Sequence, residues 1–525
     1  MVMKAVLERF VERSPVTVMA RVALERALSA EWVDELFEAH RQRQYTRELL
    51  FSTVVQLMSL VVLGLRPSLH AAAQHCEALS VSLPALYDKI RRTEPGVMRA
   101  LVQGSAERLG PVQAELRDAV HPLVPGFRVR IVDGNHLPAS EKRLGVLRGF
   151  RGAALPGHSL VVYDPDLEQV VDVVPCEDGH QQEKTLMPAL LGNAGAGELW
   201  LADRQFGTRA IIAALDERQA SFILRESRAH PCPTELGSRR YVGRVETGTV
   251  YEQAVAIPLP DGGQLRLRRI DLELDEPTED GDTLIRLLTN VPRKRLHGTT
   301  IARLYRSRWR IEGLFQRLEA VLHSEVRSLG SPRAALLAFC VALVAHNVLA
   351  VLQAAVETHP EVSAGDIEIS PFYVADTVRR GYEGMMIALP PPTWTRFEHQ
   401  RPQSSHRRSG TSPRMPCPSG CASTRAPPRS PEPNRAMRRV RRSSARSPRP
   451  GCSATAASGP IPREPTALRR QDGDGRAVMQ RRGRRDRTAL RPLARLWPTP
   501  RAQRAPRAQR ARPCRVSDLA VLRSR

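Results

Sequence analysis

The sequence predicts an α/β protein with a mixed β-sheet flanked by helices, an N-terminal helical domain and an inserted β subdomain. Three observations support this fold class. Apolar residues recur at helical spacing up to about residue 110, short β-branched runs begin at Phe127, and two long helical patterns follow. The predicted domains are residues 1–115, residues 120–395 with a β insertion at 228–283, and an Arg/Pro-rich tail at 400–525.

The N-terminal domain is predicted to consist of helices, with periodic segments at 31–40, 47–65 and 69–79. The stretch Ala71–Arg92 resembles a helix-turn-helix built around Ser80-Val81-Ser82. Its second helix carries Lys89, Arg91 and Arg92, which such a motif would place in a DNA groove. An ordinary helical hairpin with a solvated charged face explains the same pattern equally well.

The sheet is predicted from short apolar strands at 127–133, 158–163, 169–174, 198–203, 221–225 and 284–290. The turn signature Asp164-Pro165-Asp166 joins the second and third strands into a hairpin. This order implies three antiparallel strands followed by one parallel to the first. Asp133 and Asp203 would then end neighbouring strands.

Two long helices are predicted at 300–322 and 332–357. The second contains the longest apolar stretch of the chain, interrupted by His346, Asn347 and Gln353. Because these polar groups would be costly in lipid, the pattern favours a buried core helix over a membrane span.

Composition narrows the class of protein. An apolar content of 42% excludes wholesale disorder. The net charge of +24 resides in residues 401–525, which hold 32 arginines and 6 acidic residues, so the first 400 residues carry a net charge of −2. Cysteines occur singly before residue 400, and the start lacks a signal-peptide core, which predicts a soluble intracellular protein. Cys417 and Cys421 have no second pair at zinc-site spacing.

The tail allows two interpretations. Its 18 prolines, 32 arginines and lack of any lysine are typical of a disordered basic segment that binds nucleic acid through phosphates. The abrupt change of composition near residue 400 also suits an out-of-frame translation of a GC-rich gene. Resequencing that finds no frame change there would exclude the second interpretation.

Three carboxylates are candidates for chemistry. Asp133 and Asp203 are predicted at the ends of strands, and Glu312 lies on the helix after the last strand. Phosphoryl transfer on DNA can be carried out by two divalent cations, and rigidly held carboxylates are the ligands that Mg²⁺ prefers. Each carboxylate taken singly also fits a turn or a surface ion pair.

The position of Glu312 on its helix favours a functional role. At about 100° per residue, Tyr305, Arg308, Glu312 and Glu319 fall within an arc of roughly 60° beside the apolar stripe. These polar groups are therefore predicted at the rim of the core. The far side of the helix carries a basic ridge suited to a phosphate backbone or to water, formed by Arg303, Arg306, Arg310 and Arg317.

These residues resemble the motifs of the DDE transposases of bacterial insertion sequences, of the insertion-sequence-four type. The first aspartate appears as Asp133-Gly134-Asn135, and the second as Asp203-Arg204-Gln205-Phe206. The Y-x2-R-x3-E part of the third signature appears as Tyr305, Arg308 and Glu312. The resemblance covers roughly residues 20–395 and implies an RNase H-like catalytic core.

The resemblance also implies the chemistry and the partners. Asp133, Asp203 and Glu312 would be the catalytic and metal-binding residues for two Mg²⁺ ions, with Mn²⁺ as a substitute. Arg308 would contact phosphate, and Tyr305 and Arg204 would contact DNA. The partners would be double-stranded DNA, as terminal inverted repeats and target, and a second copy of the chain in a dimer. No membrane partner is expected, and the expected location is the bacterial cytoplasm, on the nucleoid.

Two features depart from the family pattern. Glu319 stands where the signature ends in Lys, and residues 228–283 contain no Trp to stack on a flipped base. Tyr241 or Tyr251 is the candidate replacement. Glu183 and Glu325 are reserve candidates should Glu312 be structural.

The sequence therefore predicts a cut-and-paste transposase that cleaves and joins DNA strands. A catalytically defective copy that only binds terminal DNA is the alternative, favoured by Glu319 and by the unusual tail. A host nuclease of the same fold would instead cut DNA without preference for element ends.

Overall fold

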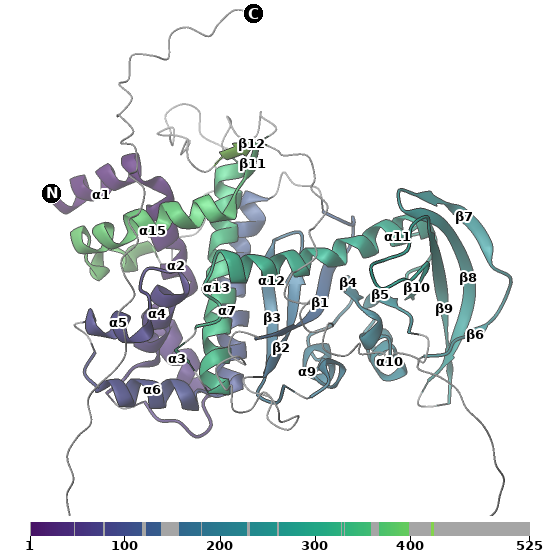
Figure 1. The fold of residues 1–525 in the computed structure, drawn as a ribbon, viewed down its shortest axis with the longest axis horizontal. Coiled ribbons are helices and arrows are strands. Elements are labelled where there is room, and N and C mark those ends of the chain that lie inside the picture. Colours follow the sequence, from purple (N-terminus) through teal and green to yellow (C-terminus); the bar gives the residue numbers. More distant parts are fainter. Residues whose placement is uncertain are drawn as a thin grey trace, which may run out of the picture. The chain divides into compact units, whose positions relative to one another are not determined.

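The computed structural model describes residues 2–46, 48–76, 79–117, 122–137, 157–179, 181–227, 231–259, 262–326, 328–329, 331–358, 367–397 and 422–424. All described residues lie in one compact unit within residues 1–432, whose fold is shown in Figure 1.

The N-terminal region is helical, as predicted. Its helices are α1 (Val2–Arg13), α2 (Pro15–Ala27), α3 (Ala30–His40), α4 (Phe51–Val62), α5 (Leu69–Gln74), α6 (Leu83–Arg92) and α7 (Pro95–Leu116). The helix predicted at 47–65 is shorter at both ends. The two short helices expected around Ser80-Val81-Ser82 are α5 and α6, and the Ser68 hydroxyl caps α5 by accepting from the Ala71 N–H.

A ten-stranded mixed sheet forms the centre of the fold, with the order β3-β2-β1-β4-β5-β10-β9-β8-β6 and with β7 paired to β8. The predicted arrangement of the first four strands is confirmed, because β1, β2 and β3 are antiparallel neighbours and β4 runs parallel to β1. The strands are β1 (Arg128–His136), β2 (His158–Asp164), β3 (Gln169–Cys176), β4 (Glu198–Ala202), β5 (Ser221–Arg225), β6 (Thr234–Glu235), β7 (Arg240–Val245), β8 (Gly248–Pro258), β9 (Gln264–Leu274) and β10 (Leu284–Thr289).

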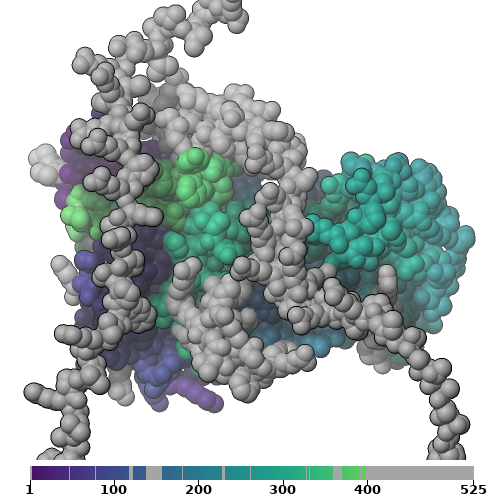
Figure 2. Space-filling model, in the orientation of Figure 1, coloured from purple at the N-terminus to yellow at the C-terminus, as the bar shows by residue number. Residues whose placement is uncertain are grey.

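The predicted β insertion forms strands, but these strands continue the central sheet. β10 pairs with β5 on one side and with β9 on the other, so the ladder is unbroken from β5 to β8. In the space-filling view, β7, β8 and β9 form the exposed teal end of the described surface (Figure 2).

Helices and short 3-10 turns complete the unit: η2 (Glu183–Thr185), α9 (Met187–Leu191), η3 (Arg204–Phe206), α10 (Arg209–Glu217), α11 (Gly298–Arg306), η4 (Ser307–Trp309), α12 (Arg310–Ala320), α13 (Pro332–Glu357), α15 (Pro371–Ala388), η5 (Pro391–Thr393) and η6 (Thr395–Phe397). The single helix predicted at 300–322 is wrong, because η4 separates α11 from α12. The Ser307 hydroxyl donates to the Leu304 carbonyl over 2.6 Å, a local bond that competes with regular helix geometry.

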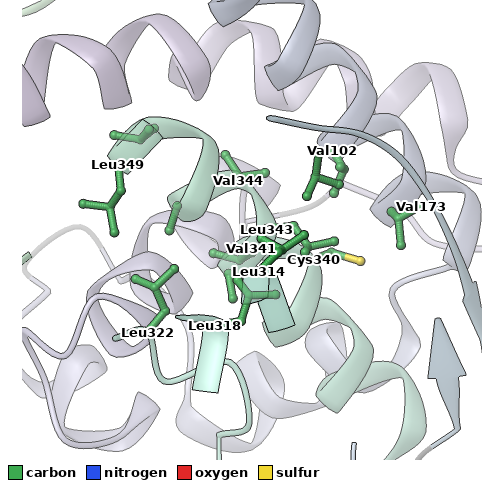
Figure 3. Packing of buried hydrophobic residues seen from close by; sticks show 14 of the residues in the cluster. Val102, Val173, Leu314, Leu318, Leu322, Cys340, Val341, Leu343, Val344 and Leu349 are labelled. Atoms are coloured by element: carbon green, nitrogen blue, oxygen red, sulfur yellow. The ribbon is translucent and has the colours of Figure 1, made fainter. Parts of the chain in front are cut away.

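Two hydrophobic cores cover the two faces of the sheet. The larger one joins the sheet to α7, α11, α12, α13 and the N-terminal helices, and the smaller one lies under α9 and α10. In Figure 3, Val341 and Leu343 of α13 pack close to Leu314 and Leu318 of α12. The N-terminal helices and the central sheet therefore share one core.

Helix α13 is a buried core helix, as its sequence predicts. Among the described helices it alone is long and apolar enough to cross a membrane, yet its most apolar window is fully buried in the protein. Two of its polar residues have partners on β3 or in the turn just before it. Asn347 donates to the Val170 carbonyl and accepts from the Val170 N–H, both at 2.8 Å, and His346 lies 3.2 Å from the Glu168 carbonyl.

Only residues 422–424 of the Arg/Pro-rich tail are described. They form a short strand, β12 (Ala422–Thr424), antiparallel to β11 (Ile367–Ile369). The sequence pattern did not predict this strand. The rest of the tail, including Cys417 and Cys421, lies outside the described residues.

The Asn347 contacts lead to a stability prediction. β3 is at the end of the sheet order, and the Asn347 amide satisfies backbone groups that no further strand pairs. Replacing Asn347 with Leu should lower the free energy of unfolding by about 1–3 kcal/mol, because a buried N–H and C=O lose their partners. Urea denaturation would measure the loss. Arg380→Ala, at an exposed ion pair on α15, is the control, and equal effects of the two substitutions would contradict the prediction.

Candidate active site

The register of the sheet brings Asp133 and Asp203 to one edge. The last residues that pair between the parallel strands β1 and β4 are Val132 and Ala202, which immediately precede the two aspartates. The strand predicted to end at Asp133 continues to His136, because residues 134–136 keep pairing with β2.

Strand alternation places both aspartates on the same face. Ile131 and Leu201, two residues earlier on each strand, belong to the core that contains α12. Since side chains alternate along a strand and Asp203 keeps an extended backbone, Asp133 and Asp203 face the same helix. Figure 1 shows α12 crossing the sheet on this face, and α12 contacts β1.

The helical segment supplies the third carboxylate and a shared arginine. Arg308 lies in η4 and Glu312 in the first turn of α12. The Arg308 guanidinium donates to Asp133 Oδ2 over 2.9 Å and to Glu312 Oε1 over 3.1 Å. Arg308 is only 6% exposed, and its Nε has no hydrogen-bond partner among the described residues. One buried guanidinium therefore connects the first and third carboxylates.

Asp203 has different partners. The Tyr305 hydroxyl donates to Asp203 Oδ1 over 3.2 Å. The Arg225 guanidinium, at the end of β5, lies 3.9 Å from the same oxygen and donates to Asp282 Oδ2 over 2.6 Å. Arg225 therefore links the second aspartate to the segment that leads into β10.

Burial changes the protonation of these groups. Burial raises the pKa of Asp133 to about 6, although the Arg308 guanidinium and the Gly134 N–H oppose the rise. Burial also raises the pKa of Glu312, and Asp203 contributes to that rise through its charge. The pKa of Tyr305 is raised by burial and by the charge of Asp203. Since the three carboxylates act on one another or on the same arginine, they form one electrostatic site.

The chemistry of the donors fits hard divalent cations. Carboxylate oxygens are the ligands that Mg²⁺ and Mn²⁺ prefer, and the raised pKa of Asp133 shows that its buried charge is incompletely compensated. Within the described ranges, no three Asp, Glu, His or Cys side chains are close enough together to hold one ion. Arg308 instead supplies positive charge between Asp133 and Glu312.

The other predicted DNA-binding residues lie at different places. Arg204 is half exposed, 3.7 Å from Asp282, and lines a hollow of about 320 Å³ with His136, Glu183 and Gln205. Arg91 and Arg92 are exposed on α6, where both pair with Asp88. Lys89 is half buried and lies 4.0 Å from the centre of the Phe37 ring while its ammonium donates to the Tyr45 carbonyl.

Ion pairs occupy most of the predicted basic ridge. Arg303 and Arg306 both pair with Glu246, and Arg310 pairs with Glu168. Glu319, which stands at the expected Lys position, is exposed on α12.

Sequence reasoning missed two residues of this site. Arg225 follows an ordinary apolar strand, and only the pairing of β5 beside β4 places it near Asp203. Trp309 directly follows Arg308, is 60% exposed and lies under the Arg308 guanidinium at 5.1 Å. Its position in the signature could have suggested a role, but its exposure depends on η4.

Comparison with known families agrees with this geometry. Residues 125–348 match the family described as "Transposase DDE domain", a range that spans β1 to most of α13 and includes all three carboxylates. The match supports a DDE transposase with nucleotidyl-transfer chemistry, and the mixed sheet flanked by helices is consistent with an RNase H-like fold. Such a domain implies DNA binding. No curated protein matches this chain significantly.

Because the pKa of Asp133 is raised in the folded protein, replacing this residue with a neutral one is predicted to increase stability in a pH-dependent way. The carboxyl has an ordinary pKa of 3.8 and a pKa of about 6 in the folded protein, so its ionisation disfavours folding as pH rises between these values. Asp133→Asn should therefore be more stable than wild type above pH 6, by about 3 kcal/mol, and not below pH 4.

Thermal unfolding in EDTA at several pH values would measure this difference. Glu217→Gln, whose side chain is 74% exposed, is the control. A stability gain of Asp133→Asn that is the same at pH 4 and pH 7 would contradict the assignment of the effect to ionisation.

Proposed function

We propose that this chain is a DNA transposase of the insertion-sequence-four type that cleaves and joins strands at the ends of an insertion sequence. Asp133, Asp203 and Glu312 are its catalytic carboxylates. The observation that carries the proposal is their convergence on one sheet edge, from β1, the end of β4 and α12, around Arg308 and Tyr305.

The chemistry follows from the donors at the site. The carboxylates would hold two Mg²⁺ ions, which supply activation of the attacking oxygen and stabilisation of the leaving oxygen. In the first reaction, the oxygen of water attacks phosphorus and the P–O3′ bond breaks, which leaves a 3′-hydroxyl and a 5′-phosphate. In the second, the freed 3′-hydroxyl attacks a target phosphodiester, and a 3′-hydroxyl leaves the target strand.

Arg308 and Trp309 are suited to hold the DNA end. The Nε of Arg308 has no hydrogen-bond partner but is buried, so a phosphate oxygen would bind this guanidinium only if Arg308 moves away from its carboxylate partners. The exposed Trp309 ring, beside it in sequence, offers a stacking surface for a base. Tyr241, which is 66% exposed on β7, is a second aromatic surface.

The remaining residues that we propose to contact DNA are basic side chains, which we rank by how exposed they are to solvent. Arg204 borders the hollow near Asp203, and Arg91 and Arg92 present exposed guanidiniums on α6. Lys89 is held by the Tyr45 carbonyl and the Phe37 ring, so its contribution to DNA binding is expected to be smaller. The proposed partners are terminal inverted repeats, target DNA and a second copy of the chain, in the bacterial cytoplasm and on the nucleoid.

Glu319 favours a second candidate function, a defective copy that binds terminal DNA without cutting it. The residue is exposed on the same helix as Glu312, and its negative charge would face the polyanionic backbone. A defective copy retains the fold and the carboxylates but loses correct placement of the DNA end.

The proposal predicts cleavage at an element boundary. With Mg²⁺, the full chain should nick a DNA fragment that spans the end of its own element, and Asp203→Ala should reduce the rate by at least a hundredfold because a metal ligand is lost. A sequencing gel would map the cut.

Each other outcome of this assay assigns a different function. Binding without cleavage would identify the defective copy, whereas cutting without preference for the boundary would identify a nuclease. Cleavage that survives in Asp203→Ala would exclude these carboxylates.

The charge of Glu319 gives a further prediction. Glu319→Lys should tighten binding of terminal DNA and steepen the dependence of log affinity on log salt concentration by about 1, because one more phosphate is neutralised. Fluorescence anisotropy at several salt concentrations would measure both. Glu217→Lys is the control for a nonspecific gain in charge, and an equal effect of the two substitutions would place Glu319 away from the DNA.

A further inference from the structure

A fourth carboxylate, Glu183, lies directly behind the strand that carries Asp133. Glu183 is the first residue of η2, and its side chain is 14% exposed. A Cβ atom added to Gly134 would overlap the carboxyl group of Glu183. The carboxyl group therefore occupies the space that any other residue at position 134 would fill.

This carboxylate approaches from the opposite face to Glu312. Gly134 lies two residues after Val132 on β1 and therefore on the same face of the sheet, and Val132 packs in the core under α9 and α10. Asp133 faces α12 on the other side. Glu183 consequently supports the catalytic strand from behind, where it does not compete with Arg308 for Asp133.

The partners of Glu183 connect the segments of both aspartates. The Gln205 amide, two residues after Asp203, donates to Glu183 Oε2, and His136 Nε2 lies 3.6 Å from Glu183 Oε1. The backbone ladder between β1 and β4 ends at Val132 and Ala202. Each aspartate directly follows this pair, so the ladder brings the two close together, and the side-chain contacts of Glu183 act on the segments just beyond it.

The charge of Glu183 has little compensation. In the part of the chain that the structure describes, its ion-pair partner is His136, which is charged only when protonated. Arg308, by contrast, pairs with Asp133 and Glu312, and Arg225 with Asp203. A hollow of about 320 Å³ opens beside Glu183, so the region behind the site is accessible to ions and solvent.

We propose that Glu183 is a positioning residue that bridges Gly134 and Gln205, fixes the spacing of Asp133 and Asp203, and thereby sets the affinity of the site for divalent cations. The inference rests on the proposed function, because it assumes that the two aspartates bind cations. It also assigns a purpose to the glycine after the first aspartate, which is to leave room for the Glu183 carboxyl.

Binding of Mn²⁺ to the full chain, measured by isothermal titration calorimetry, tests this inference. Glu183→Ala and Gly134→Ala should each weaken Mn²⁺ binding by about 10-fold or more, which is typical when a residue that orients a metal ligand is lost. The double variant should be no weaker than either single variant, because both substitutions remove the same bridge. Glu183→Gln keeps an acceptor for Gln205 and should retain most of the affinity, and Glu217→Gln is the control.

The outcomes separate the inference from its premise. If Asp203→Ala abolishes Mn²⁺ binding while Glu183→Ala and Gly134→Ala bind as wild type, Glu183 is only structural and the inference fails. If Asp203→Ala itself binds as wild type, the proposed metal site fails. Should Glu183→Ala not fold, Gln205→Ala removes the other end of the bridge, and unchanged Mn²⁺ affinity of that variant would overturn the inference.

Discussion

The buried ion pairs of Arg308 are the interaction on which the site depends. Bringing Asp133 and Glu312 together out of water is costly, because like charges repel and each loses hydration. The guanidinium offsets both costs with bonds of 2.9 and 3.1 Å. The pKa of Asp133 nevertheless stays raised, so the compensation is partial and a demand for further positive charge remains.

The sheet and its helices hold the carboxylates and Arg308 in place. Parallel pairing of β1 with β4 places Asp133 and Asp203 side by side, and η4 turns Arg308 toward them. Helix α13 anchors α12 and the edge of β3 through one continuous core. The incompletely compensated charge of Asp133 is a property expected of a site that receives further cations.

Local sequence patterns predicted much of this structure. Alternating apolar runs and the Asp164-Pro165-Asp166 turn were sufficient for the order of β1 to β4, and the polar residues within the apolar stretch of α13 were sufficient to predict a core helix. The 3-10 turn η4 was not predicted, because the Ser307 bond to the Leu304 carbonyl interrupts an otherwise regular periodicity.

The missed parts of the site depend on contacts between distant segments. Arg225 is near Asp203 only because β5 lies beside β4. Glu183 was a reserve candidate from the sequence, but its place behind Asp133 depends on the space that Gly134 leaves. The continuation of the sheet into β9 and β8 likewise follows from the pairing of β10, which no local pattern encodes. The motifs identified Asp133, Asp203 and Glu312 as candidates, whereas the partners that hold them required the fold.

The central claim is that these three carboxylates form a divalent-cation site for DNA chemistry. The most direct test is an anomalous difference map from crystals of the full chain grown with Mn²⁺. The account predicts a Mn²⁺ peak within coordination distance of Asp133 and of Asp203 or Glu312. Mn²⁺ bound elsewhere, with Asp133 and Glu312 still paired to Arg308 and Asp203 still bonded to Tyr305, would contradict it.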